Sequence, residues 1–168
     1  MSILFPAFIE LDVTEISPSP DNPKRHPERQ VQALMGSIKE FGFVMPILVS
    51  SNREIIAGHG IFEAARRLGM TRLPCMDAAH LTEAQVKAYR IADNKLAELG
   101  EWDEDALRSE FTALADLGFD LQLTGFQPFE IEATVTIPDF EPAGEATQGR
   151  LDRKAPVVCP NCGHEFTA

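Results

Sequence analysis

The sequence predicts an α+β fold: a mixed sheet with packed helices, followed by a small helical segment and a flexible tail. Short apolar or alternating runs, typical of strands, are interspersed with longer runs whose apolar residues recur at helical spacing. Apolar side chains make up 44% of the 168 residues, so the chain can bury a core. From about residue 134 the periodicity ends and Pro, Gly and Glu dominate, which predicts a linker.

The first expected elements are a strand, a loop and a helix. Residues 7–16 alternate between apolar and polar side chains, as in a half-buried strand. Residues 17–27 are dense in Pro, Ser, Asp and Asn, which predicts a loop with turns. Apolar residues at helical spacing then predict a helix over 28–41, which Gly42 closes.

The remaining elements follow from the same patterns and from capping residues. Thr82 with Gln85 forms a weak capping box, and Asp103 is an expected N-cap. The expected strands are 46–49, 54–57 and 73–76. The expected helices are 62–68, 80–99, 103–117 and a stub at 130–133.

Charge is distributed unevenly along the chain. Residues 1–97 carry 11 basic and 11 acidic side chains, whereas 98–145 carry one basic and 13 acidic side chains. Residues 146–168 carry three and two, so the net charge is −11. An acidic chain disfavours strong autonomous DNA binding, unless a basic patch overcomes the repulsion. Two local basic groups stand out: Lys24, Arg25 and Arg29, and then Arg66, Arg67 and Arg72.

Other bulk features point to the cytoplasm. The start of the chain lacks the basic and long apolar regions of a signal peptide, and no apolar run is long enough to cross a membrane. Three cysteines, two of them in one Cys-x-x-Cys, do not make a disulfide framework. A reducing cytoplasm without membrane association is therefore expected.

The most informative segment is the strand-to-helix connection at Gly58-His59-Gly60. Glycines let the backbone approach a ligand closely, and the free N–H groups and dipole of a helix N-terminus attract anions. Residues 57–64 are thus the best candidate site for a phosphate-bearing ligand. The alternative is a connection that needs glycine only for a tight turn.

Several separate boxes of the sequence resemble the N-terminal domain of ParB-like proteins, the ParB/sulfiredoxin fold. The boxes are Ile16-Ser-Pro-Ser-Pro-Asp-Asn-Pro-Lys-Arg25, Ser37–Val49, Ala57-Gly-His-Gly60 and Ala92-Asp-Asn-Lys95. The resemblance spans roughly residues 9–127 and is strongest to a branch of phages and mobile elements that is often linked to DNA methyltransferases. Together with the composition of the later segments, it predicts a ParB/sulfiredoxin-like domain over 1–100, an acidic helical extension over 101–133, a linker over 134–156 and a zinc-knuckle-like tail over 157–168.

The resemblance also implies a nucleotide site. In ParB-like proteins the glycine box cradles nucleotide phosphates, and an acid–amide pair helps to hold Mg²⁺. Carried over, this implies CTP or ATP with Mg²⁺ at Asp93 and Asn94. The implied nucleotide-binding residues are Lys24, Arg25, Gly58, His59, Gly60, Arg66 and Asn94.

One departure from the family pattern weakens this implication. Ile61 stands where many relatives carry an arginine. A lost guanidinium removes about 1.5–3 kcal/mol for each charge-assisted bond. Either Arg66 or Arg67 substitutes, or nucleotide binding is weak or absent.

An enzymatic alternative rests on three titratable residues. His59, Glu63 and Asp93 are the candidate acid, base or metal-binding residues of a ParB-like nuclease or nucleotide hydrolase. His59 is equally well interpreted as a turn residue whose ring bonds a neighbouring backbone group. Sulfiredoxin carries its catalytic cysteine in this turn, so His59 argues against sulfiredoxin chemistry. Cys75, inside an apolar strand, is expected to be an inert buried thiol.

The tail contains half of a zinc ribbon. Cys159-Pro-Asn-Cys162 presents two thiols to one tetrahedral metal, and His164 is a third candidate ligand. Four ligands are needed, so Zn²⁺ requires a second copy of the chain or another protein. A tail that binds no metal is the alternative.

The favoured function is a ParB-like, nucleotide-binding accessory protein that acts in DNA partition, modification or transcription control. DNA contact is expected to be indirect or weak, because 101–133 is acidic and has no basic recognition helix. Expected partners are a DNA methyltransferase or another phage protein, and a second copy in a homodimer. The alternatives are the enzyme described above and a degenerate, non-catalytic interaction module.

Overall fold

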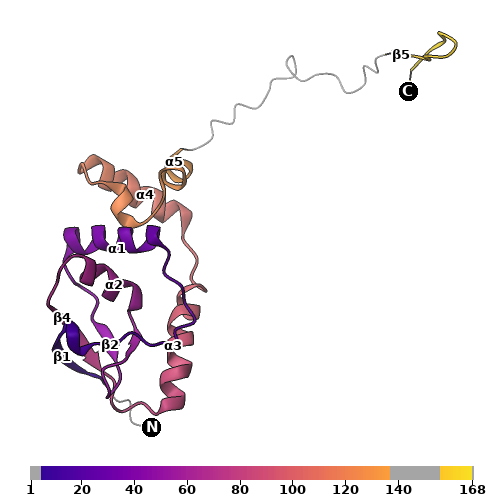
Figure 1. Cartoon of the computed structure of the whole chain (residues 1–168). Helices are drawn as coiled ribbons and strands as arrows, with labels where there is room; N and C mark the ends of the chain where they lie inside the picture. The colour runs from indigo at the N-terminus through magenta and orange to yellow at the C-terminus, as the bar shows by residue number, and fades with distance from the viewer. Residues whose placement is uncertain (1–4, 137–155, 168) are drawn as a thin grey trace. The chain divides into compact units, whose positions relative to one another are not determined.

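The computed structural model describes residues 5–136 and 156–167 of the chain. Its contacts divide the chain into two compact units, Met1–Thr136 and Ile137–Ala168, and each is described by itself. The first unit contains a four-stranded sheet, five α-helices and two short 3₁₀ helices among its described residues (Figure 1).

The sheet is mixed and has the strand order β1-β4-β2-β3. Strand β1 pairs antiparallel with β4, β4 parallel with β2, and β2 antiparallel with β3. An isolated bridge from Ser17 to Glu54 attaches the following loop to β3. The strands are β1 (Ala7–Asp12), β2 (Ile47–Val49), β3 (Ile55–Ala57) and β4 (Arg72–Asp77).

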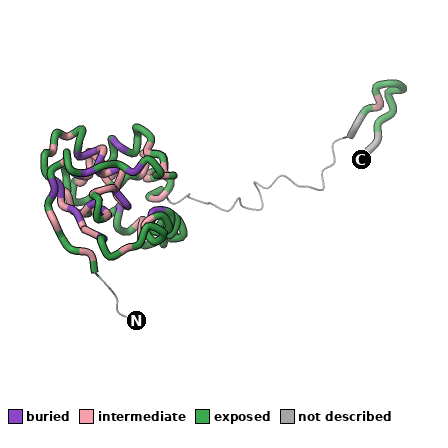
Figure 2. Tube along the Cα trace, turned by 60° about the horizontal axis from the view of Figure 1, so that its bottom comes forward, coloured by how far each residue is buried: buried purple, intermediate pink, exposed green. Residues whose placement is uncertain are grey.

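Helices α1 (Glu28–Phe41) and α2 (His59–Arg67) pack against each other, and α2 also contacts β2. The buried residues gather between these helices and the sheet (Figure 2). This cluster closes because α1 and α2 each turn one apolar face inward, as their periodicity predicts. The cluster comprises Leu11, Ile16, Val31, Ile38, Ile47, Val49, Ile55, Phe62, Ala64, Ala65, Leu73 and Cys75.

Helix α3 (Glu83–Ala97) contacts the body mainly at β3. The Thr82 hydroxyl accepts from the Gln85 N–H and the Gln85 side chain accepts from the Thr82 N–H, which completes the expected capping box. Most of α3 is exposed (Figure 2), and its fully buried residue is Arg90.

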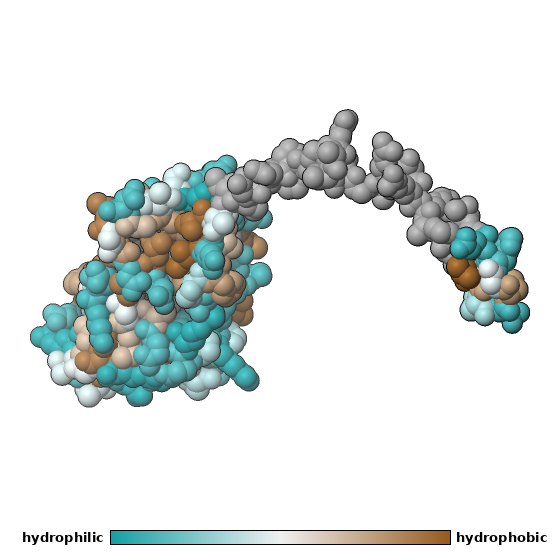
Figure 3. Space-filling model, turned by 90° about the horizontal axis from the view of Figure 1, so that it is seen from above, coloured by the Kyte–Doolittle hydropathy of each residue, from teal (hydrophilic) through white to brown (hydrophobic). Residues whose placement is uncertain are grey.

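Helices α4 (Glu104–Asp116) and α5 (Pro128–Val135) pack together beside the short helix η2 (Leu121–Thr124). Phe111 is buried here and meets the ring of Phe126 edge to face, with centroids 5.1 Å apart. Apolar side chains also gather on the outer surface of this part of the molecule (Figure 3), and Trp102, Leu117 and Phe129 are among the exposed ones.

The second unit contains a hairpin of β5 (Pro156–Val158) and β6 (Glu165–Thr167). The Cys159 N–H donates to the His164 carbonyl at 2.9 Å, and the Gly163 N–H donates to the Cys159 carbonyl at 2.9 Å. These bonds close the turn that carries the Cys-x-x-Cys sequence.

The predicted α+β class is confirmed, with three differences in detail. The first strand ends early, because Asp12 and Glu15 form a capping box around a 3₁₀ turn, η1 (Val13–Glu15). Helix α2 begins at His59 rather than residue 62. The expected stub is the two-turn helix α5, which has Pro128 in its first turn and a Gln127–Glu130 capping box. Most of the predicted linker lies at 137–155, outside the described residues.

Candidate functional site

The glycine turn Gly58-His59-Gly60 has a backbone conformation that would let a ligand approach closely. Gly58 has φ +99° and ψ 20° and is the N-cap of α2. An added Cβ would lie 3.3 Å from Ile61 Cγ2 and 3.5 Å from Ile47 Cα. Because no side chain caps this helix, its first N–H groups are left to water or a ligand. The turn therefore has the features of an anion cradle.

The His59 side chain is hydrogen-bonded to the loop of residues 17–27. The Ser19 N–H donates to His59 Nε2 at 3.3 Å, which requires the neutral ring with its proton on Nδ1. The ring stacks on His26, with centroids 6.4 Å apart. Burial, with the nearby charges of Arg90 and His26, lowers the pKa of His59 to about 4. His59 thus holds the loop of residues 17–27 against the turn as a neutral acceptor.

Gly60 is required by packing. It is buried, and an added Cβ would lie 2.9 Å from His26 Nδ1 and 3.1 Å from Leu34 Cδ1. The second glycine of the turn thus lets α1 and the His26 ring approach α2. A substitution at Gly60 would disturb the fold as well as any ligand.

Two residues predicted for the site lie further along α2. The Glu63 carboxylate pairs with Arg66 at 3.2 Å and with Arg67 at 2.8 Å. Arg67 also pairs with Glu28 of α1 at 2.7 Å. Arg66 and Arg67 are in the last turn of the helix, at the end opposite the free N–H groups. That either of them substitutes for an arginine at Ile61 remains a prediction.

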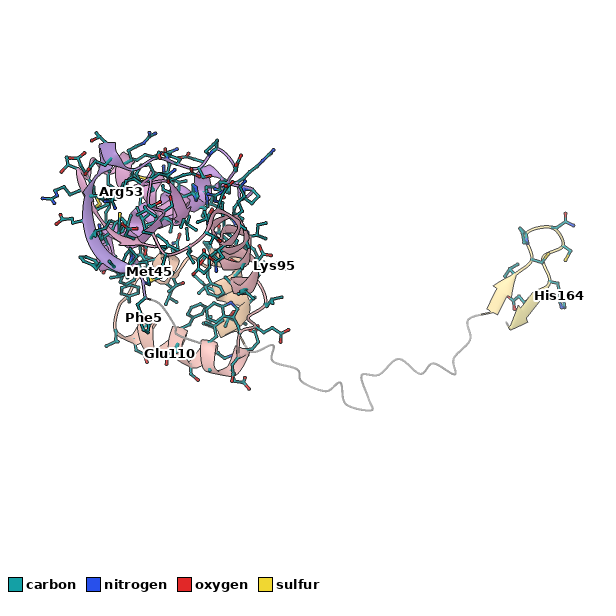
Figure 4. All side chains as sticks on the ribbon, turned by 90° about the horizontal axis from the view of Figure 1, so that it is seen from below. Phe5, Met45, Arg53, Lys95, Glu110 and His164 are labelled. Carbon is teal, nitrogen blue, oxygen red and sulfur yellow. The ribbon has the colours of Figure 1, made fainter. Side chains whose placement is uncertain are left out.

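A small cavity of about 180 Å³ brings Lys24 and Asn94 together. The Lys24 ammonium pairs with Glu98 at 2.6 Å, which ties the loop to α3. The Asn94 amide nitrogen donates to the Arg90 carbonyl at 3.0 Å. Asp93 is exposed on α3. The cavity is lined by Pro23, Lys24, Arg90, Ile91, Asn94, Lys95 and Glu98; Figure 4 labels Lys95 on α3.

Arg90 is a functional candidate that the sequence pattern did not reveal. Only 4% of its surface is exposed. Its Nη2 donates to Glu54 Oε1 at 2.9 Å, whereas its Nε is buried with no hydrogen-bond partner. An unsatisfied buried donor costs about 1–3 kcal/mol. In the sequence Arg90 resembles any cation on a polar helix, because burial depends on how α3 packs against β3.

Two larger cavities flank this region. One of about 440 Å³ lies between α3 and the β2–β3 turn, and Arg90 and Glu54 line it with Asp21, Ser50 and Lys87. The other, of about 510 Å³, lies between α1 and the η2–α5 segment. Arg25 and Arg29 line this second cavity with Lys24. The first basic group of the sequence is thus assembled on one surface.

The described residues include no group of three or more His, Cys, Asp or Glu side chains that could hold a metal ion. The predicted zinc ligands Cys159, Cys162 and His164 are therefore not gathered into such a group, and the hydrogen bond that the structure gives His164 is made by its backbone carbonyl. N–H groups of Asn161 and Cys162 lower the pKa of the Cys159 thiol. Asp93 and Asn94 together carry three side-chain oxygens, fewer than the six ligands of octahedral Mg²⁺, so Mg²⁺ there would need phosphate and water ligands.

The sequence matches the family model described as ParB N-terminal domain over residues 6–100, more than half of the chain. The chain belongs to this family. A second model, described as ParB-methyltransferase HTH domain, matches residues 105–160 of this ParB-like chain. Charge and helical pattern alone predict only an acidic extension at 101–133. The match therefore relates this segment to an HTH domain, which those features did not reveal.

Known relatives agree with the family assignment. The ParB-like nuclease domain-containing protein YnaK of Escherichia coli (strain K12) is 42% identical over 71 residues, which cover 42% of this chain and 82% of YnaK. A C-terminally truncated chromosome-partitioning protein ParB from Caulobacter crescentus, complexed with CTP-γ-S, matches with a TM-score of 0.63 at 23% identity. That match covers 77% of each chain and establishes the common fold.

Two further solved structures match more weakly. The Caulobacter ParB complexed to the centromeric parS site has a TM-score of 0.44 at 21% identity, and the match covers 78% of this chain and 73% of that one. Sulfiredoxin from Arabidopsis thaliana has a TM-score of 0.43 at 23% identity, covering 50% and 97%. Both scores are too low to support conclusions about this chain.

The predicted nucleotide-binding residues lie at four places. Gly58, His59 and Gly60 form the turn, while Lys24 and Asn94 share the small cavity, whose lining includes no residue of the turn. Arg25 lines the larger basic cavity, and Arg66 lies at the far end of α2. No hydrogen bond joins any two of His59, Glu63 and Asp93 within the described part of the chain. The predicted catalytic set remains a prediction.

No helix in the described residues is both long and apolar enough to cross a membrane.

Proposed function

We propose that this ParB-like chain binds a nucleoside triphosphate with Mg²⁺ and acts as an accessory module in DNA partition, modification or transcription control. The observation that carries the proposal is the uncapped N-terminus of α2 behind the left-handed Gly58. The phosphates would accept from the free N–H groups, and the helix dipole would favour their charge. The Caulobacter ParB complexed with CTP-γ-S makes CTP the first nucleotide to test.

The residues around the turn support a phosphate ligand. Lys24 and Asn94 line one cavity, and Lys95 adds a second ammonium group. When a nucleotide brings its phosphate oxygens, Asp93 and Asn94 would complete the shell of a bound Mg²⁺. His59, as a neutral acceptor, would keep the loop of residues 17–27 in place.

The association with DNA is proposed from the family. The ParB-methyltransferase HTH model covers the segment that contains α4 and α5. Its acidic charge would weaken contact with phosphates, so DNA would be engaged with help from a partner or a second copy of the chain. A DNA methyltransferase is the partner that the family description favours.

Calorimetric titration of the full chain with CTP, ATP and GTP, each with and without Mg²⁺, tests the proposal. We expect one nucleotide to bind, and Lys24→Ala and Asn94→Ala to weaken its binding about tenfold each. Lys87→Ala is the matched control, because Lys87 is an exposed lysine on α3 that pairs with Glu83 and lines a different cavity. No heat with any nucleotide would leave the degenerate interaction module as the better description.

A second candidate function is hydrolysis of nucleic acid or nucleotide. The name of the relative YnaK, a ParB-like nuclease domain-containing protein, is the reason to test for hydrolysis. Release of phosphate or cleavage of DNA with Mg²⁺, lost in Asp93→Ala, would support an enzyme. Nucleotide binding without turnover would support the accessory module alone.

A further inference from the structure

Arg90 has hydrogen-bonding capacity that its known partner does not use. The Glu54 carboxylate accepts only from Nη2, and the buried Nε–H has no acceptor in the described structure. A guanidinium carries five N–H donors and binds carboxylates or phosphates along one planar edge. A buried arginine with an unpaired edge indicates that an acceptor is missing.

The position of Arg90 indicates which kind of acceptor. It lines the 180 Å³ cavity together with three other groups that favour anions or polar oxygens, namely Lys24, Asn94 and Lys95. Glu98 is the single carboxylate residue in this lining, and both lysines pair with it. The charge of Arg90 also acts on His59, the first residue of α2. Arg90 therefore lies near His59 and lines the same cavity as Asn94.

The arginines at the end of α2 already form ion pairs with carboxylates. Arg66 and Arg67 pair with Glu63, and Arg67 also pairs with Glu28. Ile61 carries no charge. Among the described residues near the turn, Arg90 is the buried guanidinium with a donor to spare.

We infer that Arg90 is the arginine of the proposed nucleotide site, whose Nε–H donates to a phosphate oxygen while Glu54 holds Nη2. It would act in place of an arginine at position 61, but from α3 instead of α2. The inference rests on the proposed function and adds the residue that sets the preference for phosphates. The charge-assisted bond would be strong because the guanidinium is already desolvated and held in place.

A purely structural Arg90 is the alternative. In that case the Arg90–Glu54 pair only joins α3 to β3, and substitutions at either residue would lower stability equally without any dependence on phosphates. The two roles differ in how binding responds to the number of phosphates on the ligand.

The direct test observes Arg90 in the unmodified full chain. In a ¹⁵N-labelled sample, the Nε–H resonance of Arg90 is identified by its loss in Arg90→Lys and followed during titration with CTP, ATP, GTP and cytidine, with Mg²⁺. We expect the bound triphosphate to shift this resonance and slow its exchange with water, and cytidine to leave it unchanged. A triphosphate that binds calorimetrically without moving the resonance would overturn the inference and leave the proposed function intact.

Variants provide the second test. Arg90→Lys keeps the charge and removes Nε–H, and Arg72→Lys is the matched control, because Arg72 is an exposed arginine of β4 that pairs with Glu10. We expect Arg90→Lys to weaken binding of the triphosphate at least tenfold and of the monophosphate much less, and Arg72→Lys to change neither. Equal affinities of Arg90→Lys and the natural chain for the triphosphate would refute the role of Arg90 and leave the proposed function intact. Absence of any nucleotide binding to the natural chain would refute both the inference and the proposed function.

Discussion

The candidate site is organised by a few side chains that bond to each other across the chain. Ser19 and His59 are 40 residues apart in sequence, and their hydrogen bond holds the proline-rich loop against the start of α2. Arg90 and Glu54 are 36 residues apart and join α3 to the residue before β3. These contacts attach the loop to the start of α2 and attach α3 to the start of β3. The local chemistry of the turn is thus determined by residues distant in sequence.

Gly60→Ala should destabilise the protein by about 1 kcal/mol, although alanine is the better helix former. The reason is the close contact that its Cβ would make with His26 Nδ1 and Leu34 Cδ1. Urea denaturation measures the change in the free energy of unfolding. His26→Ala combined with Gly60→Ala should recover part of the loss relative to His26→Ala alone. A Gly60→Ala variant more stable than the natural chain would contradict the packing role.

His59 should make stability depend on pH in the acid range. Its pKa is about 4 in the folded state, below the ordinary value of 6.5, so the unfolded chain binds more protons between these values. The free energy of unfolding should be fully retained above about pH 6.5 and should fall by about 2 kcal/mol as the pH drops from about 6.5 to about 4.

His59→Gln is the control, because an amide oxygen can accept from the Ser19 N–H without titrating. The charged groups that act on His59, namely Arg90, His26 and Glu54, are present in both proteins, so the comparison isolates the replaced ring. The natural chain should lose more stability than His59→Gln between about pH 7 and pH 4. Equal losses would show that His59 is not held neutral by the fold.

The elements divide into a sheet body and a small helical cluster. In the body, α1 and α2 cover the sheet and bury the main core. In the cluster, α4, η2 and α5 enclose Phe111, and the ring of Phe126 lies between Phe111 and Trp102. The cluster coincides with the start of the segment that the HTH model matches. Its few buried residues suggest that one aromatic side chain stabilises most of it.

Phe111→Ala should destabilise the protein by about 3–5 kcal/mol, because it leaves a cavity under Phe126. The fluorescence of Trp102, whose ring meets that of Phe126 at a tilt of 59°, reports on the cluster directly during urea denaturation. Leu117→Ala on the same helical segment is the control, since Leu117 is 81% exposed and its loss should change stability by less than about 0.5 kcal/mol. Similar losses in both variants would mean that the cluster does not depend on Phe111.

At the scale of the whole molecule, the domain organisation indicates an association with DNA, whereas the acidic charge disfavours it. The family models assign a ParB N-terminal domain followed by an HTH segment. Yet residues 98–145 carry 13 acidic side chains and one arginine, which opposes DNA phosphates. The basic residues Lys24, Arg25 and Arg29 instead line a cavity between α1 and the η2–α5 segment. A DNA contact would have to use such local groups or those of a partner.

The two compact units should be separable. The described core lies within Met1–Thr136, so a chain ending at Thr136 should keep the melting temperature of the full protein. Calorimetric melting of both chains measures this, and retained nucleotide affinity would locate the proposed site in the first unit. A large drop in melting temperature would show that residues 137–168 stabilise the body.

Zn²⁺ added to the full chain should change its melting temperature only if a second copy completes the ligand set.

The sequence by itself determined the fold class, the helix bounded by Gly42, the capping box of Thr82 and the glycine turn, because periodicity, caps and glycines act over a few residues. The family boxes also identified the domain before any geometry was known. The tertiary structure alone decided that Gly60 is needed for packing, that Arg66 pairs with Glu63, and that Arg90 is buried with an unpaired donor. Burial and pairing arise from contacts between residues tens of positions apart, and no local pattern encodes them.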